Sequence, residues 1–285
     1  MPGIADATTV GAVHLTAADL ERSLDYYRRA IGLQVHGRDD GRARLGAGGE
    51  DLLVLYEQPG AEPAPHNTGL FHFALLLPSR ADLARWMVHA AEEQVALTGM
   101  SDHLVSEALY LRDPDLHGIE IYRDRPRAEW PTTGNGGVAM DTLPLDARAV
   151  LSSLDGGEPP FDGLPRDTRM GHVHLQVADV DATERFYAGV LGFDIMAHLG
   201  DQATFLSAGG YHHHLGGNTW NSRGASPPPP GAAALRHAEV VVPDDDELQR
   251  VAGRVADAGQ DPAPQENGGV LVRDPSQNAL LVRVA

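Results

Sequence analysis

The chain repeats itself, and this repetition restricts the folds it can adopt. A stretch that begins at Ala12, A-V-H-L-T-A-A-D-L-E-R-S-L-D-Y-Y-R-R-A-I-G-L, returns from His172 as H-V-H-L-Q-V-A-D-V-D-A-T-E-R-F-Y-A-G-V-L-G-F. A long period of this kind indicates copies of one supersecondary unit, none of which can bury its apolar face alone. One copy has histidine where the other has alanine, so the copies are expected to differ in function.

Each strong copy reads as a strand, then a helix, then short strands. The opening strand alternates in polarity, and the next segment carries apolar and aromatic residues at helical spacing. Asp19 and Asp179 stand where an N-cap is expected, and Gly32 and Gly192 where the helix should end. Two weaker copies begin near Leu70 and Leu235, and each closes on an Asp-Pro turn and a final strand. The predicted order is therefore strand, helix and about three strands, four times over.

The repeats predict two domains joined by a Gly/Pro-rich linker. A short helix is expected within the linker, near residues 145–154. The expected N-terminal domain covers residues 1–130, with modules at about 8–57 and 68–123. The linker covers 131–166. The C-terminal domain covers 167–285, with modules at about 169–220 and 233–285.

Composition excludes several classes of protein. The net charge is −18 and every basic residue is arginine, which disfavours binding to nucleic acid or anionic membranes. No apolar run approaches the roughly 18 residues of a membrane span, and the N-terminus lacks the pattern of a signal peptide. We therefore expect a cytoplasmic protein and leave open whether it forms a homo-oligomer. Cysteine is absent, so any metal site must use nitrogen and oxygen ligands.

Three motifs carry a resemblance to a known family: G-H-V-H-L, F-L-S-A-G-G-Y-H-H-H and D-P-D…G-I-E-I-Y. Together with the fourfold repeat they resemble the vicinal oxygen chelate superfamily, which includes glyoxalases, bleomycin-resistance proteins and extradiol dioxygenases. The bacterial catechol 2,3-dioxygenase-like branch is the most similar in pattern. The resemblance covers nearly the whole chain apart from the linkers. It implies an α+β fold in which four βαβββ modules form two half-barrel cups.

The same resemblance implies one ligand position on the first strand and one on the last strand of each module. The first module then offers Ala12 and Val54, the second His72 and Glu120, the third His172 and the run 212–214, and the fourth His237 and Leu281. Pairing the modules in simple order leaves each cup without a full ligand set.

Pairing the second module with the third brings together His72, Glu120 and His172. Two histidines and one carboxylate form the facial set that leaves open positions on Fe(II), and Mn(II) accepts the same ligands. The first and fourth modules would then form a structural cup without a metal. The family's D-P-D-G turn reads D-P-D-L here, so Leu116 departs from the pattern.

The resemblance also implies residues that act on the substrate. In similar extradiol enzymes a histidine of the neighbouring module is the acid–base group, and alignment gives His213, with His212 or His214 as the alternatives after a one-residue shift. Tyr110, ten residues before the carboxylate, would hydrogen-bond the bound catecholate. His103 would shield the oxygen site.

The implied function is extradiol cleavage of a catechol-type substrate by O2, with the accepted ring substituents left open. One alternative is a glyoxalase- or isomerase-like lyase using Ni, Zn or Mn. That class commonly has a second carboxylate where this chain has histidines. The other alternative is a metal-free binding protein of the resistance type, which would have no need of three metal ligands.

Overall fold

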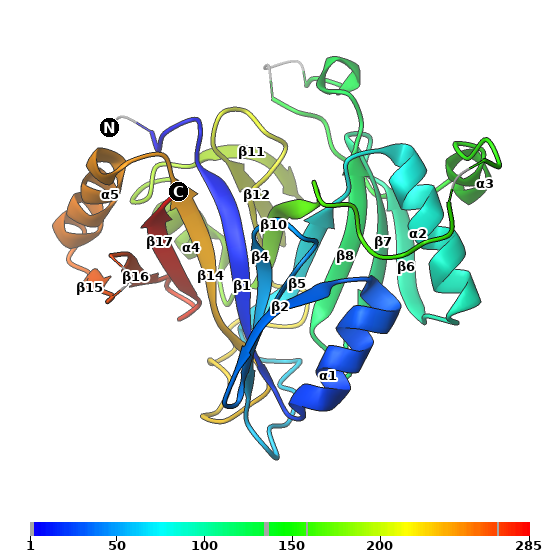
Figure 1. Cartoon of the computed structure of the whole chain (residues 1–285). Coiled ribbons are helices and arrows are strands. Elements are labelled where there is room, and N and C mark those ends of the chain that lie inside the picture. The colour runs from blue at the N-terminus through cyan, green and yellow to red at the C-terminus, as the bar shows by residue number, and fades with distance from the viewer. Residues whose placement is uncertain (1–2, 134–136, 158, 267) are drawn as a thin grey trace. The chain divides into compact units, whose positions relative to one another are not determined.

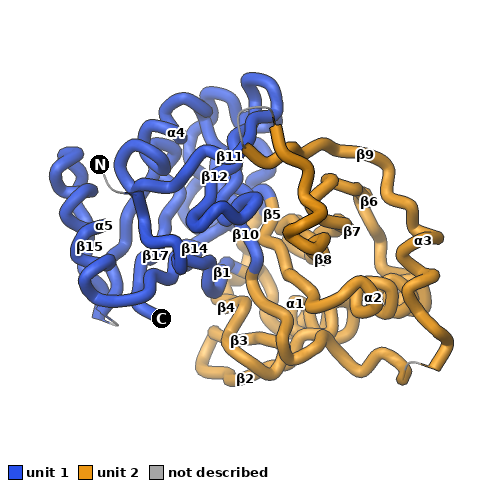
Figure 2. The backbone as a smooth tube through the Cα atoms, turned by 90° about the horizontal axis from the view of Figure 1, so that it is seen from above, with its two compact units in different colours: residues 1–16, 63–71, 171–285 blue, residues 17–62, 72–170 orange. Residues whose placement is uncertain are grey.

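The computed structural model describes residues 3–133, 137–157, 159–266 and 268–285 (Figure 1). The chain divides into two compact units, and each is built from separate segments (Figure 2). Unit 1 contains residues 1–16, 63–71 and 171–285, and unit 2 contains residues 17–62 and 72–170. The division into sequential domains at 1–130 and 167–285 stays a prediction.

Unit 1 is built mainly from strands, with two helices. Its elements are β1 (Thr9–Ala17), β10 (Arg169–Gln176), α4 (Val180–Tyr187), β11 (Asp194–Leu199), β12 (Ala203–Ser207), β13 (Leu215–Asn218), β14 (Leu235–Val242), α5 (Asp245–Asp257), β15 (Ala263–Pro264), β16 (Val270–Arg273) and β17 (Ala279–Val284). β1 and β10 each extend slightly past the boundary of the unit.

Unit 2 repeats the same succession of elements and adds the linker. Its elements are α1 (Leu20–Tyr26), the π-helix η1 (Tyr27–Ile31), β2 (Gln34–Asp39), β3 (Arg42–Gly46), β4 (Asp51–Glu57), most of β5 (Gly69–Leu76), α2 (Arg80–Glu92), β6 (Leu97–Asp102), β7 (Ser106–Arg112), β8 (Gly118–Asp124), the 3-10 helix η2 (Arg127–Glu129), β9 (Leu143–Pro144) and α3 (Ala147–Leu151).

Strand order confirms the predicted α+β class. Unit 1 has the orders β15-β16-β17-β14-β1 and β11-β12-β13-β10, and unit 2 has β4-β3-β2 and β5-β8-β7-β6-β9. In three modules the first and last strands are parallel neighbours: β5 with β8, β10 with β13 and β14 with β17. β1 pairs antiparallel with β14, and His14 lies opposite His237. This contact joins the first and fourth modules, as the distribution of ligand positions predicted.

The predicted helix caps are present at both helix starts. Asp19 and Asp179 each accept a hydrogen bond from the backbone N–H three residues on. Gly32 ends the first helix with a φ of 91°. The third module's helix stops earlier than predicted, at Tyr187 instead of Gly192. Gly189 lies two residues after Tyr187, and glycine is about 1 kcal/mol less favourable than alanine inside a helix, which accounts for the early end.

The two Asp-Pro turns share one hydrogen-bonding scheme. The carboxylate of Asp113 accepts two backbone N–H groups of its own turn and the hydroxyl of Tyr27, at 2.8 Å. Asp274 does the same in the other repeat, with Tyr187 at 3.1 Å. Burial raises the pKa of both carboxyl groups. Leu116 adopts a φ of 67° without loss of this scheme, so the turn before β8 keeps its register.

The segments just upstream of the two strong repeats make matching contacts, which the sequence patterns did not predict. The N–H of Ile4 donates to the carbonyl of Gly192 at 2.8 Å, and the N–H of Leu164 donates to Gly32 at 2.9 Å. Both apolar side chains are buried. Each leading segment (residues 4–8 and 164–168) is therefore bonded to the glycine that follows the helical segment of the other repeat, Gly192 or Gly32.

The linker is partly regular. β9 pairs with β6, and α3 covers part of the predicted 145–154 helix. Among the described residues, no helix combines the length and apolar character that crossing a membrane requires.

Candidate functional site

The two ligand candidates of unit 2 face each other. Glu120 on β8 lies opposite Ala74 of the parallel strand β5, and His72 lies two residues before Ala74, hence on the same face of the sheet. His72 Nε2 is 3.0 Å from Glu120 Oε2, and the two residues are 6% and 2% exposed. Two atoms that both bear lone pairs approach this closely only when a proton or a cation lies between them. A metal could take the place of that proton.

Tyr110 adjoins this pair. It lies directly opposite Glu120 in the antiparallel pairing of β7 with β8, so the two side chains are neighbours on one face. Burial raises the pKa of Tyr110 well above its usual value, and the charge of Glu120 and a hydrogen bond to it raise the pKa further. The hydroxyl therefore keeps its proton and can donate it in a hydrogen bond.

His103 lies in the turn between β6 and β7 and contacts the same hydroxyl. Its Nε2 is 2.6 Å from Tyr110 Oη, and its Nδ1 is 2.7 Å from the backbone carbonyl of Asp141. A carbonyl only accepts, so His103 Nδ1 carries a hydrogen and donates it to Asp141. The role of Asp141 was not predictable, because it is a backbone contact from 38 residues away in the linker.

The histidines of unit 1 form a second group. His172 on β10 is 1% exposed, and its ring lies 4.0 Å from that of His213 and 6.1 Å from that of His212. The Nδ1 atoms of His212 and His213 are 2.7 Å apart. The structure thus brings His172 and the predicted acid–base residue together within one unit.

Residues 212–214 were expected on the last strand of the third module, and this placement is wrong. They precede β13, because Gly209 and Gly210 adopt positive φ values of 59° and 66° and carry the chain through a turn. The ring of His214 is held by the hydroxyl of Ser207 at 3.0 Å and by a backbone N–H at 3.2 Å. His214 therefore has a structural environment, whereas His213 lies against His172.

The first and fourth modules contain a different polar cluster. His14 stacks on His237 with ring centroids 3.9 Å apart, and His14 Nε2 is 3.1 Å from Glu239. Arg283 donates to the same carboxylate at 2.8 Å. Burial alone would raise the pKa of Glu239, but the hydrogen bonds from His14 and Arg283 and their charges lower it to about 2. The guanidinium of Arg283 neutralises the Glu239 carboxylate, which is therefore not available to bind a metal. This agrees with a structural role for the cluster.

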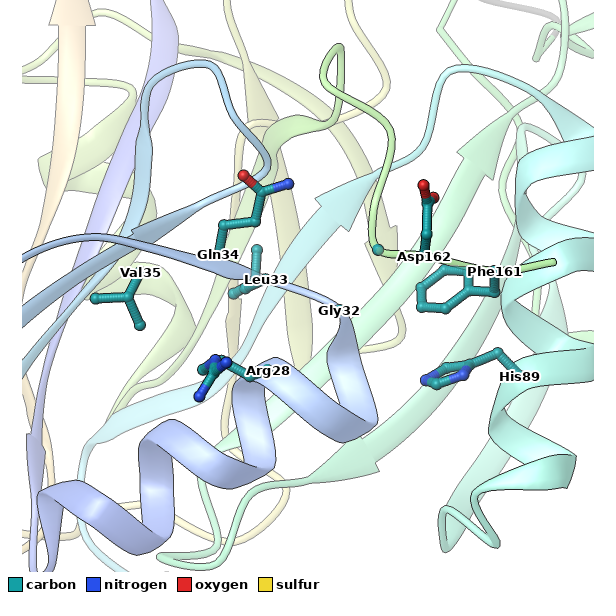
Figure 3. A pocket seen from close by; sticks show the side chains of 9 residues that line it. Arg28, Gly32, Leu33, Gln34, Val35, His89, Phe161 and Asp162 are labelled. Atoms are coloured by element: carbon teal, nitrogen blue, oxygen red, sulfur yellow. The ribbon is translucent and has the colours of Figure 1, made fainter. Parts of the chain in front are cut away.

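Unit 2 also has a cavity of about 600 Å³ beside the end of η1 (Figure 3). Its lining includes Arg28, His89, Phe161 and Asp162. The His89 ring stacks on Phe161 at 4.0 Å and its Nε2 donates to a backbone carbonyl at 2.9 Å. One imidazole and one carboxylate do not make a metal site of three ligands, so this cavity is separate from the predicted chemistry.

Comparison with known proteins gives consistent results. The family model described as Glyoxalase/Bleomycin resistance protein/Dioxygenase superfamily matches residues 9–121 and 169–282. A protein of Bacillus subtilis (strain 168) named Catechol-2,3-dioxygenase is 43% identical over 288 residues, covering 100% of both chains.

Solved structures show the same fold at low sequence identity. A crystal structure from Bacillus subtilis subsp. subtilis str. 168 has a TM-score of 0.66 at 17% identity, covering 97% of this chain and 85% of the other. Glyoxalase I from Zea mays has a TM-score of 0.56 at 15% identity, with coverages of 97% and 92%. At these identities the likeness concerns the fold alone.

Proposed function

The chain belongs to the glyoxalase/bleomycin resistance protein/dioxygenase superfamily, and from this premise we propose that it is an extradiol dioxygenase that inserts O2 into a catechol-type substrate. The observation that carries the proposal is the relative named Catechol-2,3-dioxygenase, which matches over the full length of both chains. The chemistry of the described side chains supports it.

The family and the donor set imply a metal cofactor, and we propose Fe(II) bound by His72, Glu120 and His172. All three residues are buried, and each offers one ligand atom. Two imidazoles and a carboxylate suit Fe(II), and Mn(II) accepts the same set. The proposal thereby pairs the second module with the third.

When bound, the metal would polarise the two vicinal hydroxyl groups of the substrate and leave a position for O2. The hydroxyl of Tyr110 would hold the ring oxygen of the substrate, since its raised pKa keeps it a donor. His103 would orient that hydroxyl through its Nε2. His213 would take a proton from the substrate and return one to the product side, as an imidazole can near neutral pH.

Two other functions fit the same fold. A metal-dependent lyase would need a further carboxylate ligand, and the corresponding region of unit 1 holds imidazoles. A metal-free binding protein would have no use for the buried His72–Glu120 pair, because buried ionisable groups are expensive to keep. Metal analysis of the purified protein separates this second alternative from the enzymes.

The deciding experiment is oxygen uptake by Fe(II)-reconstituted protein over a panel of catechols, with the absorbance of the ring-fission product followed in parallel. Uptake matched by a yellow product supports extradiol cleavage. Bound iron without uptake points to the lyase, and failure to bind iron or manganese points to the binding protein.

A further inference from the structure

A row of aromatic rings begins beside His172. His174 lies two residues further along β10, and therefore on the same face of the sheet. In the sheet, Gly216 of β13 lies opposite His174 of β10 on one side and opposite Phe205 of β12 on the other. A Cβ at Gly216 would lie 2.9 Å from the His174 ring, so the glycine leaves the space that this ring occupies. The rings of His174 and Phe205 meet edge to face, with centroids 5.6 Å apart.

Two more rings extend the row towards solvent. Phe71 contacts His174 and Trp220, with centroid distances of 5.4 and 5.1 Å. Trp220 also contacts His174 at 5.6 Å and is 40% exposed. Phe71 and Phe205 are partly exposed. A cluster of partly exposed aromatic rings on a soluble protein commonly marks a binding surface.

The row is continuous with two histidines of the proposed active site. Phe205 contacts His213 edge to face at 5.1 Å, and His213 lies 4.0 Å from His172. All of these residues belong to unit 1. Imidazole, phenyl and indole groups therefore lead from the metal-ligand candidate His172 to the exposed indole of Trp220.

We propose that Phe71, His174 and Trp220 form a subsite for an uncharged aromatic substituent on the catechol ring. This inference rests on the proposed function and names its substrate class. Aromatic rings bind planar apolar groups by stacking and edge-to-face contact. The side chains that make up the row are all aromatic, and the net charge of −18 disfavours anionic substituents.

The test is calorimetric binding of three probes to the Fe(II)-loaded protein without oxygen: catechol, 4-phenylcatechol and 3,4-dihydroxybenzoate. We expect 4-phenylcatechol to bind about tenfold more tightly than catechol, and 3,4-dihydroxybenzoate to gain nothing. Trp220→Ala should abolish the tenfold preference while leaving the affinity for catechol unchanged. Phe71→Leu should reduce the preference. Trp130 is a half-buried tryptophan of unit 2 that lies outside the row and donates to the carbonyl of Arg125, so Trp130→Ala is the matched control and should retain the preference.

A fourth probe, 4-phenylphenol, lacks the diol and separates this inference from the proposed function. We expect it to bind metal-free protein and to quench tryptophan fluorescence in the wild type but not in Trp220→Phe. If it does so while no catechol supports oxygen uptake, the subsite stands and the dioxygenase proposal fails. If catechols are cleaved but Trp220→Ala leaves the ratio of kcat/KM for phenylcatechol and catechol unchanged, the subsite is refuted and the dioxygenase stands.

Discussion

At the scale of single residues, Glu120 is the most exacting test of the metal proposal. It is 2% exposed and within 3.0 Å of His72, so its removal deletes the only carboxylate of the proposed ligand set. We expect Glu120→Ala to retain under about a tenth of the wild-type iron, because loss of a ligand weakens a three-residue site severely. Metal analysis after gel filtration measures this, and full retention of iron would refute the assignment.

His213 should behave differently, because its proposed role is proton transfer. We expect His213→Phe to keep its iron and to lose about 10²- to 10⁴-fold in kcat, the usual contribution of a positioned general acid–base group. His214→Phe is a suitable comparison, since His214 is held by Ser207 and should affect stability more than turnover. Equal losses in His212→Phe and His213→Phe would show that the acid–base residue has been misassigned.

Glu239 makes a prediction about pH. Its pKa is lowered to about 2 in the folded protein from an ordinary 4.5, so the ionised form stabilises the fold. That contribution is complete above pH 4.5 and is lost as the pH falls from 4.5 towards 2. Glu239→Gln should therefore be less stable than the wild type by about 1.5–3 kcal/mol at pH 7, since hydrogen bonds to charged groups are of this size.

The measurement is urea unfolding of both proteins at a series of pH values. The difference between them should shrink steadily through the acid range. A difference that is constant with pH would mean that Glu239 stabilises the fold without its charge.

At the scale of elements, Leu116 tests the turn that precedes β8. Its φ of 67° suits glycine, and a left-handed conformation costs other residues about 1–2 kcal/mol. Glycine also has more conformational entropy in the unfolded chain, and this offsets the relief of strain by roughly 0.4–1 kcal/mol. We expect Leu116→Gly to be stabilising by at most about 1 kcal/mol, measured by thermal unfolding. Gln277→Gly is the control, because Gln277 has a φ of 66° in the matching turn, and it should show a similar small stabilisation. Marked destabilisation of both variants would contradict the strain argument.

The elements that the sequence predicted well are those with local signals. Asp19 and Asp179 cap helices because their side chains bond within their own turn. The placement of residues 212–214 failed for the opposite reason. Two glycines in left-handed conformations delay the start of β13, and a glycine pair alone does not reveal which φ values it will adopt.

At the scale of the whole molecule, the repeat predicted the module order, and the ligand positions predicted the pairing of the first and fourth modules, which together offer only His237; β1 and β14 make this contact. The sequence did not predict that the two compact units would be built from five separate segments of the chain. No local pattern marks the leading segments that contribute to these units. Residues 4–8 and 164–168 are too short for periodicity, and their function depends on carbonyls far away in the sequence.

The leading segments give the last prediction. Ile4 and Leu164 are 6% and 4% exposed, and the backbone N–H of each donates a hydrogen bond to a glycine that follows the helical segment of the other repeat. Truncating a buried aliphatic side chain to alanine costs about 2–5 kcal/mol. We expect Ile4→Ala and Leu164→Ala each to lose stability within that range. Urea unfolding at pH 7 measures this, with Leu151→Ala, an exposed position, as the control.

A loss under about 0.5 kcal/mol in both variants, as is usual at exposed sites, would mean that the leading segments contribute little to the stability of the fold. Comparable losses in both would show that the repeat begins at residues 4 and 164, upstream of the strands by which it is seen in the sequence.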